Sequence, residues 1–244
     1  MPFFISTFES FHFQIIRLFT KQATMKEQTT HRRGFIGALL GGAAAFGLSS
    51  VLAPAKMLGA TTLSNPGVAD AEKWFEQVKG KHKMVFDVPK HNDGRAIGWA
   101  LTLMDTYNDL GTPDADLSIV LIFRSGGTPL ALADPIWVKY GVGKRIEMKD
   151  PETKVYAKKN LFAKCKTEDD DCIELFQKRG GLVGVCNHAI EGMSEGLAKQ
   201  MKLKKEDVLK DFMDNLLPEI QLMPSGIWAI HRAQEAGCAF SYGG

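Results

Sequence analysis

Apolar segments alternate with amphipathic ones through most of residues 69–244, and this alternation predicts the fold. The strongest apolar run, Leu117–Phe123, and the run that ends at Cys186 are typical of strands buried on both faces of a parallel sheet. Weaker strand patterns lie at 84–88, 219–223 and 238–242. Helical spacing of apolar residues predicts helices at 69–78, 95–110, 172–179, 189–199, 204–217 and 227–236, with short helical stretches from 128 and 134. Strands that alternate with helices predict an α/β fold, with a mostly parallel sheet flanked by helices.

The same pattern divides the chain into segments. Residues 56–82 are predicted to form a linker with a short helix, and residues 83–244 a single α/β domain. Within this domain, 143–171 is polar, charged and weakly periodic, so it is interpreted as an excursion from the core. Residues 1–24 hold six of the fifteen phenylalanines without a helical or strand period, and Met25 follows as a second start. They are therefore interpreted as an upstream extension that is not part of the native protein.

Residues 25–55 resemble a twin-arginine (Tat) export signal. The arginine pair 32–33 precedes a mildly apolar, glycine-rich run at 36–52, and Ala53-Pro54-Ala55 provides a site of the kind that signal peptidase cleaves. A membrane helix is the alternative interpretation, but the run is short for a span. The segment predicts export to the periplasm by the Tat translocase, with a mature chain that begins near Lys56.

The charge balance excludes an electrostatic surface for nucleic acid. Of 30 basic and 28 acidic residues, five basic and two acidic ones lie in 1–55, so the remainder has 25 basic and 26 acidic residues. A nucleic-acid-binding domain would instead carry a clear excess of lysine and arginine. No nucleic-acid partner is predicted.

The four cysteines show no metal-binding spacing. There is no CxxC pair, and the intervals fit neither a zinc ribbon nor a zinc finger, so no metal and no cofactor is predicted. Cys165 and Cys172 enclose a polar segment that can form a loop, and export would let a disulfide between them persist. Cys238 is expected to be buried. A bridge between Cys186 and Cys238 remains an alternative if the last strand runs beside the strand that ends at Cys186.

The expected active region lies at the carboxyl ends of the strands. In open α/β sheets the crevice beyond these ends holds ligands, and Cys186 ends a strand where a helix follows. The positive end of a helix favours a thiolate, which makes Cys186 the leading candidate for a reactive residue. A small buried hydrophobe is the alternative. If the sheet is parallel, the other strand ends add further candidates to the same crevice: His91, Asn92, Arg124, Ser125, Asn187, His188 and Ser225.

Two of these residues are assigned catalytic roles beside Cys186, each with an alternative. Arg124 could favour the thiolate form of Cys186, or it could bond to carbonyl groups or a neighbouring subunit. His188 could act as a base or ligand, or it could be a capping or surface residue. As a metal pair, Cys186 and His188 would still need two or more ligands from elsewhere.

Several segments together resemble the DsrE/DsrF-like (YchN-like) family. They are the Cys186-Asn187 pair and the segments 120–132, 217–220, 223–227 and 232–240, which keep the family's order and spacing. The resemblance implies a small α/β sandwich that assembles into trimers or hexamers. It also implies that a cysteine at the position of Cys186 carries sulfur as a persulfide. Cys238 stands where the family commonly has an aromatic residue, and an export signal departs from the usual cytoplasmic location.

The resemblance suggests an exported persulfide carrier or sulfurtransferase-like protein that acts through Cys186. Its partners would be a sulfur donor or acceptor protein and further copies of the same chain. Three tryptophans, Trp99, Trp137 and Trp228, support assembly if one domain cannot bury them all. The alternative is a non-catalytic, oligomeric protein that binds small molecules in the periplasm.

Overall fold

A computed structural model describes residues 70–167 and 170–244, and it confirms the α/β fold. Five parallel strands form one sheet in the order β4-β3-β2-β1-β5. The strands are β1 (His82–Lys90), β2 (Leu117–Gly126), β3 (Leu182–Cys186), β4 (Ile220–Met223) and β5 (Ala239–Tyr242). Each lies where the apolar pattern predicts it.

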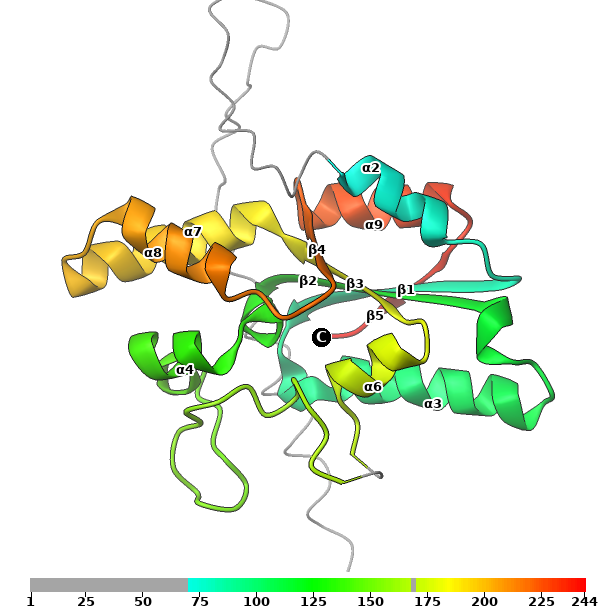
Figure 1. Ribbon diagram of the computed structural model, residues 1–244, viewed down its shortest axis with the longest axis horizontal. Coiled ribbons are helices and arrows are strands. Elements are labelled where there is room, and N and C mark those ends of the chain that lie inside the picture. The colour runs from blue at the N-terminus through cyan, green and yellow to red at the C-terminus, as the bar shows by residue number, and fades with distance from the viewer. Residues whose placement is uncertain (1–69, 168–169) are drawn as a thin grey trace, which may run out of the picture. The chain divides into compact units, whose positions relative to one another are not determined.

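Helices connect successive strands (Figure 1). The α-helices are α2 (Ala71–Trp74), α3 (Arg95–Asp109), α4 (Asp134–Tyr140), α5 (Val142–Arg145), α6 (Ile173–Lys178), α7 (Asn187–Met201), α8 (Lys205–Asp214) and α9 (Gly226–Glu235). Short 3-10 turns are η2 (Phe75–Gln77), η3 (Asn92–Gly94), η4 (Asp114–Asp116) and η5 (Thr128–Ala131). Among the described residues, no helix is long and apolar enough to cross a membrane.

Both faces of the sheet are buried, which explains the continuous apolar run in β2. Ile119, Leu121 and Phe123 pack into a core with residues of α3, α4, α6, α7 and α8. Val120 and Ile122 point the other way, into a second core with residues of α2 and α9. Figure 1 shows α2 and α9 together over one side of the sheet, with α3 and α6 over the other.

The direction of the connections explains which helix covers which face. Successive steps from β1 to β4 move across the sheet in one direction, and right-handed crossovers place their helices on one face. The connection through α9 returns from β4 to β5 at the opposite edge, so α9 packs on the other face. The chain therefore leaves the neighbouring strands β3 and β4 toward opposite faces. Cys186, in register with Met223, lies at this switch point, which is where open α/β sheets commonly hold their ligands.

Two predicted boundaries need correction. The helix expected within the linker 56–82 belongs to the folded domain, because Ala71, Trp74 and Phe75 are buried in the core with α9. The domain therefore begins before residue 83. The predicted export signal and the upstream extension lie outside the described residues.

The segment 143–171 is not wholly an excursion from the core. Met148 and Ala157 are buried in the larger core cluster. Buried Asn160 donates from Nδ2 to the carbonyl oxygens of Leu130 and Leu132, at 2.8 and 3.0 Å. The segment is thus hydrogen-bonded to the turn after β2, although most of its surface faces solvent.

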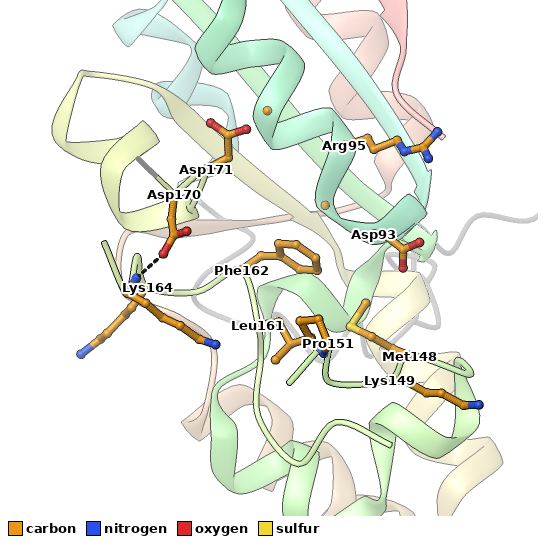
Figure 2. Close-up of a pocket in the computed structure, with 13 residues that line it drawn as sticks. Asp93, Arg95, Met148, Lys149, Pro151, Leu161, Phe162, Lys164, Asp170 and Asp171 are labelled. Carbon is orange, nitrogen blue, oxygen red and sulfur yellow. Dashed lines mark hydrogen bonds between the residues drawn. The ribbon is translucent and has the colours of Figure 1, made fainter. Parts of the chain in front are cut away.

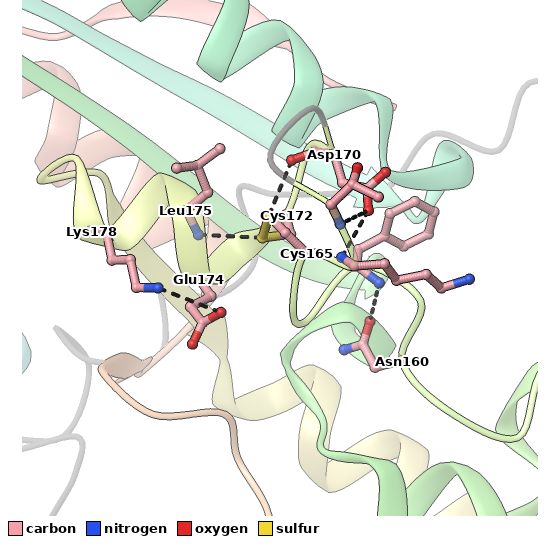
Figure 3. Close-up of a disulfide and its surroundings, with 10 residues drawn as sticks. Asn160, Cys165, Asp170, Cys172, Glu174, Leu175 and Lys178 are labelled. Carbon is pink, nitrogen blue, oxygen red and sulfur yellow. Dashed lines mark hydrogen bonds and ion pairs between the residues drawn. A yellow bond between two sulfur atoms is a disulfide. The ribbon is translucent and has the colours of Figure 1, made fainter.

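A disulfide joins Cys165 to Cys172, the pairing proposed from the sequence (Figure 3). It ties the polar loop to the start of α6, where Cys172 Sγ also accepts a hydrogen bond from the Leu175 N–H at 3.3 Å. Cys186 and Cys238 are both free and buried. The alternative bridge between them is wrong, because β5 lies beside β1 and two strands separate it from β3.

Candidate functional site

Cys186 ends β3 and caps the first turn of α7. Its Sγ accepts a hydrogen bond from the Ala189 N–H at 3.4 Å, so the sulfur lies at the N-terminus of a 15-residue helix. On the neighbouring strand it is in register with Met223. The residue is 7% exposed, and it lines the cavity described next.

An open cavity of about 720 Å³ lies over Cys186 and runs along α7. Three of the predicted site residues line it: Cys186, His188 and Ser125. Arg145 and Gln200 contribute polar groups, and apolar side chains such as Met193 and Leu197 complete much of the wall. The parallel sheet therefore brings the ends of β2 and β3 to one cavity, as expected for an α/β site.

Arg145 is the cation of this cavity, and it was not predicted. Its Nε donates to the Tyr140 carbonyl oxygen at 2.7 Å, and Nη1 donates to Oε1 of Gln200. These contacts fix the guanidinium over the far part of α7. Arg145 lies in the segment interpreted as an excursion, and no feature of the local sequence distinguishes it from neighbouring lysines.

Arg124 pairs with a buried carboxylate instead of contacting Cys186. Its Nε and Nη2 donate to the two carboxylate oxygens of Asp87, at 2.6 and 2.7 Å, in a bidentate pair. This hydrogen bonding is the main reason that the pKa of Arg124 is raised. Burial opposes the shift, whereas the charge of Asp87 and, more weakly, those of Tyr242 and Cys186 add to it. Arg124 also packs against Gly226 at the start of α9, and it does not line the cavity. Its charge therefore acts on Cys186 at longer range than a contact.

Asp87 was also missed, although the sequence holds a signal for it. It is the one charged residue in the apolar centre of β1, and it is 5% exposed. A buried carboxylate requires a partner. The register places Asp87 opposite Ile122, two residues before Arg124, on the neighbouring strand.

Asn187 and His188 share one carboxylate on α7. Asn187 Nδ2 donates to Oε1 of Glu191 at 2.9 Å, and His188 Nδ1 lies 3.7 Å from Oε2 of the same residue. The His188 side chain is 75% exposed, so it stands at the rim of the cavity. Asn187 Oδ1 is buried, with no hydrogen-bond partner among the described residues.

The remaining predicted residues have structural roles at strand ends. His91 Nε2 lies 3.1 Å from the Ile146 carbonyl oxygen, and its Nδ1 accepts from the Asp93 N–H, so Nε2 carries the proton that it donates. Asn92 has φ of 40° in the turn that follows β1. Ser225 caps α9 by accepting from the Trp228 N–H at 3.2 Å. None of the three lines the cavity.

A second cavity of about 500 Å³ lies between the start of α3 and the disulfide-closed loop. Figure 2 shows Phe162 and Leu161 at its centre, with charged side chains such as Asp93 and Lys164 around them. It contains none of the predicted site residues. No group of three or more potential metal ligands occurs in the described parts of the chain.

Comparisons with known proteins assign no family. No protein-family model matches the chain, and no curated protein matches it. Among solved structures, a protein of unknown function from Methanobacterium thermoautotrophicum aligns with 14% identity and a TM-score of 0.36. The alignment covers 66% of this chain and 98% of that chain. A likeness at this level carries no argument about function.

Proposed function

We propose that this protein is an exported persulfide carrier of the sulfurtransferase type, which acts through Cys186. One observation supports this most: a free thiol caps a long helix on the floor of an open cavity at the carboxyl edge of a parallel sheet. The resemblance to DsrE-like proteins at Cys186 points to the same chemistry.

The transfer proceeds by thiolate attack on a sulfane sulfur. Cys186 S⁻ attacks the outer sulfur of a donor persulfide, R–S–SH; a new S–S bond forms at Cys186 and the donor S–S bond breaks. The electron pair of the broken bond leaves with the donor as R–S⁻. An acceptor thiolate then attacks the outer sulfur of the Cys186 persulfide and restores the Cys186 thiolate. No external oxidant is needed.

The surrounding groups fit these two steps. The Ala189 N–H and the N-terminus of α7 stabilise negative charge on Sγ. His188, at the exposed rim, supplies a proton to the leaving thiolate. The low exposure of Cys186 protects its persulfide from bulk solvent.

Intact mass spectrometry tests the proposal. Purified protein is treated with inorganic polysulfide, and each chain should gain the mass of sulfur atoms that a reductant removes. The gain should vanish in Cys186→Ser and persist in the matched control Cys238→Ala. The Cys238 thiol is about as buried as that of Cys186, but it does not line the cavity. Equal gain in Cys186→Ser would contradict the assignment.

A non-catalytic binding protein is the second candidate. The burial of Cys186 favours it, because buried cysteines are often inert packing residues. In that case, wild-type protein and Cys186→Ser should both remain unloaded by polysulfide while the cavity still binds a ligand.

The location and the assembly are part of the same proposal. A disulfide between Cys165 and Cys172 supports an oxidising compartment, in agreement with the export signal and a periplasmic location. Exposed apolar residues on β5 support a homo-oligomer, in which the family resemblance favours trimers or hexamers.

A further inference from the structure

A short hairpin, residues 149–159, projects from the domain after α5. Near its tip the Asp150 N–H donates to the Val155 carbonyl oxygen at 2.8 Å. At its base, Met148 and Ala157 are buried in the larger core cluster, and the Ala157 N–H donates to the Met148 carbonyl oxygen at 2.9 Å. Figure 1 shows this segment in light green, where it extends away from the sheet beyond α4. The core therefore holds the base of the hairpin and leaves its tip in solvent.

The hairpin carries positive charge that the protein leaves unpaired, and we call it the basic hairpin. Both of its acidic side chains are already used. Asp150 is 9% exposed, and its Oδ1 accepts from the N–H groups of Glu152 and Thr153, at 2.8 and 3.2 Å. Glu152 pairs with Lys166. Four lysines of the basic hairpin are exposed and form no ion pair among residues 70–167 and 170–244: Lys149, Lys154, Lys158 and Lys159.

Two apolar side chains stand exposed among these lysines. Val155 is 57% exposed and Tyr156 is 41% exposed. Lys149 and Tyr156 are opposite one another in an antiparallel bridge, so their side chains lie on the same side of the hairpin. A single apolar residue on a surface is ordinary, but here an adjacent pair is enclosed by unpaired cations. The basic hairpin thus presents apolar and cationic groups to the same partner.

We propose that the basic hairpin docks this protein on an anionic phospholipid bilayer. Polybasic segments are attracted to such a surface, and tyrosine is enriched at the boundary between membrane and water. Burial of apolar groups at this boundary adds to the electrostatic attraction. The lysines meet the lipid phosphates, while Val155 and Tyr156 enter the boundary. A soluble polyanion would attract the lysines but would offer Val155 no acyl chains. The proposal does not depend on the chemistry of Cys186.

Cosedimentation with vesicles tests the proposal. Residues 56–244 are used, because they contain every described residue without the predicted export signal, which would itself bind lipid. The vesicles are made of phosphatidylcholine alone or of an equal mixture with phosphatidylglycerol. Wild type should sediment with the mixture and stay in solution with phosphatidylcholine alone. The bound fraction should fall as salt is raised, because salt screens exposed charges.

Paired variants separate the charge of the hairpin from the charge of the whole chain. Lys154→Asn with Lys158→Gln should lower the partition coefficient on the mixed vesicles about tenfold to thirtyfold. Asparagine is used at position 154 because φ there is 60°, in the left-handed region that asparagine tolerates. The matched control, Lys73→Gln with Lys79→Gln, removes the same charge at α2 and beyond η2, on the opposite face of the sheet. It should bind as wild type does.

A second pair tests the apolar contact. Val155→Ser with Tyr156→Ser should lower the partition coefficient about tenfold and leave the salt dependence unchanged. All variants should keep the thermal midpoint of wild type, because every exchanged side chain is exposed. Absence of wild-type binding to the mixed vesicles, or an equal loss in the lysine variant and its control, would overturn the proposal. Binding that falls with the lysines but not with Val155 and Tyr156 would also overturn it, in favour of a soluble polyanion.

Discussion

At the scale of single residues, the pair of Asp87 and Arg124 links β1, β2 and α9. The Asp87 side chain is 7% exposed and that of Arg124 23%, so neither charge is well solvated. Removal of one partner from such a pair leaves the other buried without compensation. Asp87→Ala should therefore lower the free energy of unfolding by about 3 kcal/mol in urea titrations.

An exposed pair provides the control for this prediction. Lys81 and Asp116 lie 2.8 Å apart, but the lysine side chain is 73% exposed. Asp116→Ala should cost less than about 1 kcal/mol. If Asp87→Ala costs no more than Asp116→Ala, the pair with Arg124 is not a structural link. The double variant Asp87→Ala, Arg124→Leu should recover part of the loss, because it removes the unpaired charge.

The buried thiol of Cys238 predicts a dependence of stability on pH. Burial raises its pKa from the ordinary 9.0 to about 11, and the charge of Lys83 offsets only part of this. The folded state thus favours the neutral thiol, so the stabilisation is complete below pH 9 and is lost as pH rises toward 11. Two pKa units correspond to about 2 to 3 kcal/mol. Unfolding titrations of wild type and Cys238→Ala should differ by a fall of this size between pH 9 and 11, and parallel curves would contradict the prediction.

The sequence could predict the part of the site that follows from strand ends. Cys186, His188 and Ser125 end neighbouring strands or begin the next helix, and a parallel sheet necessarily brings them to one edge. Arg145 could not be predicted, because it reaches the cavity through the packing of α4 and α5, which the strand pattern does not determine. Arg124 was expected in the cavity, but the alternation of side chains along β2 directs it to the face covered by α9.

At the scale of elements, the apolar period predicted all five strands, but it failed where buried residues are isolated. Met148, Ala157 and Asn160 are buried one at a time among exposed lysines and acidic residues, so no window of the sequence shows a period. The short helix α2 was assigned to a linker because four residues give too little pattern to indicate which face is buried. Both errors come from tertiary contacts that local periodicity does not record.

The disulfide between Cys165 and Cys172 should add stability without being required for folding. Closure of so short a loop is worth about 2.5 kcal/mol on the chain-entropy estimate. The variant Cys165→Ala, Cys172→Ser removes the bridge and keeps a hydroxyl that can cap α6 in place of the sulfur. It should fold, with a free energy of unfolding lower by up to about 2.5 kcal/mol. Dithiothreitol should destabilise wild type similarly and leave the variant unchanged; an unaffected wild type would contradict the prediction.

At the scale of the whole molecule, we expect export to an oxidising compartment, where the disulfide between Cys165 and Cys172 can persist. The twin arginines Arg32 and Arg33 should direct the chain to the periplasm, where cleavage near Lys56 leaves the mature protein. Changing both arginines to lysine should retain the precursor in the cytoplasm, while Lys26→Gln should be exported as wild type. Cell fractionation and N-terminal sequencing measure both results, and an intact Met25 terminus on a cytoplasmic wild-type protein would refute export.

The last prediction concerns assembly through the edge of the sheet. β5 pairs with β1 on one side, and its other edge has no partner strand within the described residues. Phe240 and Tyr242 alternate along β5 on one face and are 48% and 53% exposed, which is unusual for a strand that remains alone at an edge. Of the three tryptophans considered, Trp137 is fully buried and gives no support to assembly, whereas Trp99 is 44% exposed.

We therefore expect an oligomer in which β5 is covered by another copy of the chain. Light scattering at micromolar concentration should give a multiple of the monomer mass, and Phe240→Lys with Tyr242→Lys should shift it toward the monomer, because lysine on an edge strand opposes strand pairing and apolar contact. The control is Val138→Lys, which should leave the mass unchanged. Val138 is an apolar residue on α4 that is 63% exposed. A monomeric wild type would exclude assembly, and an oligomer that survives both lysines would place its interface away from β5.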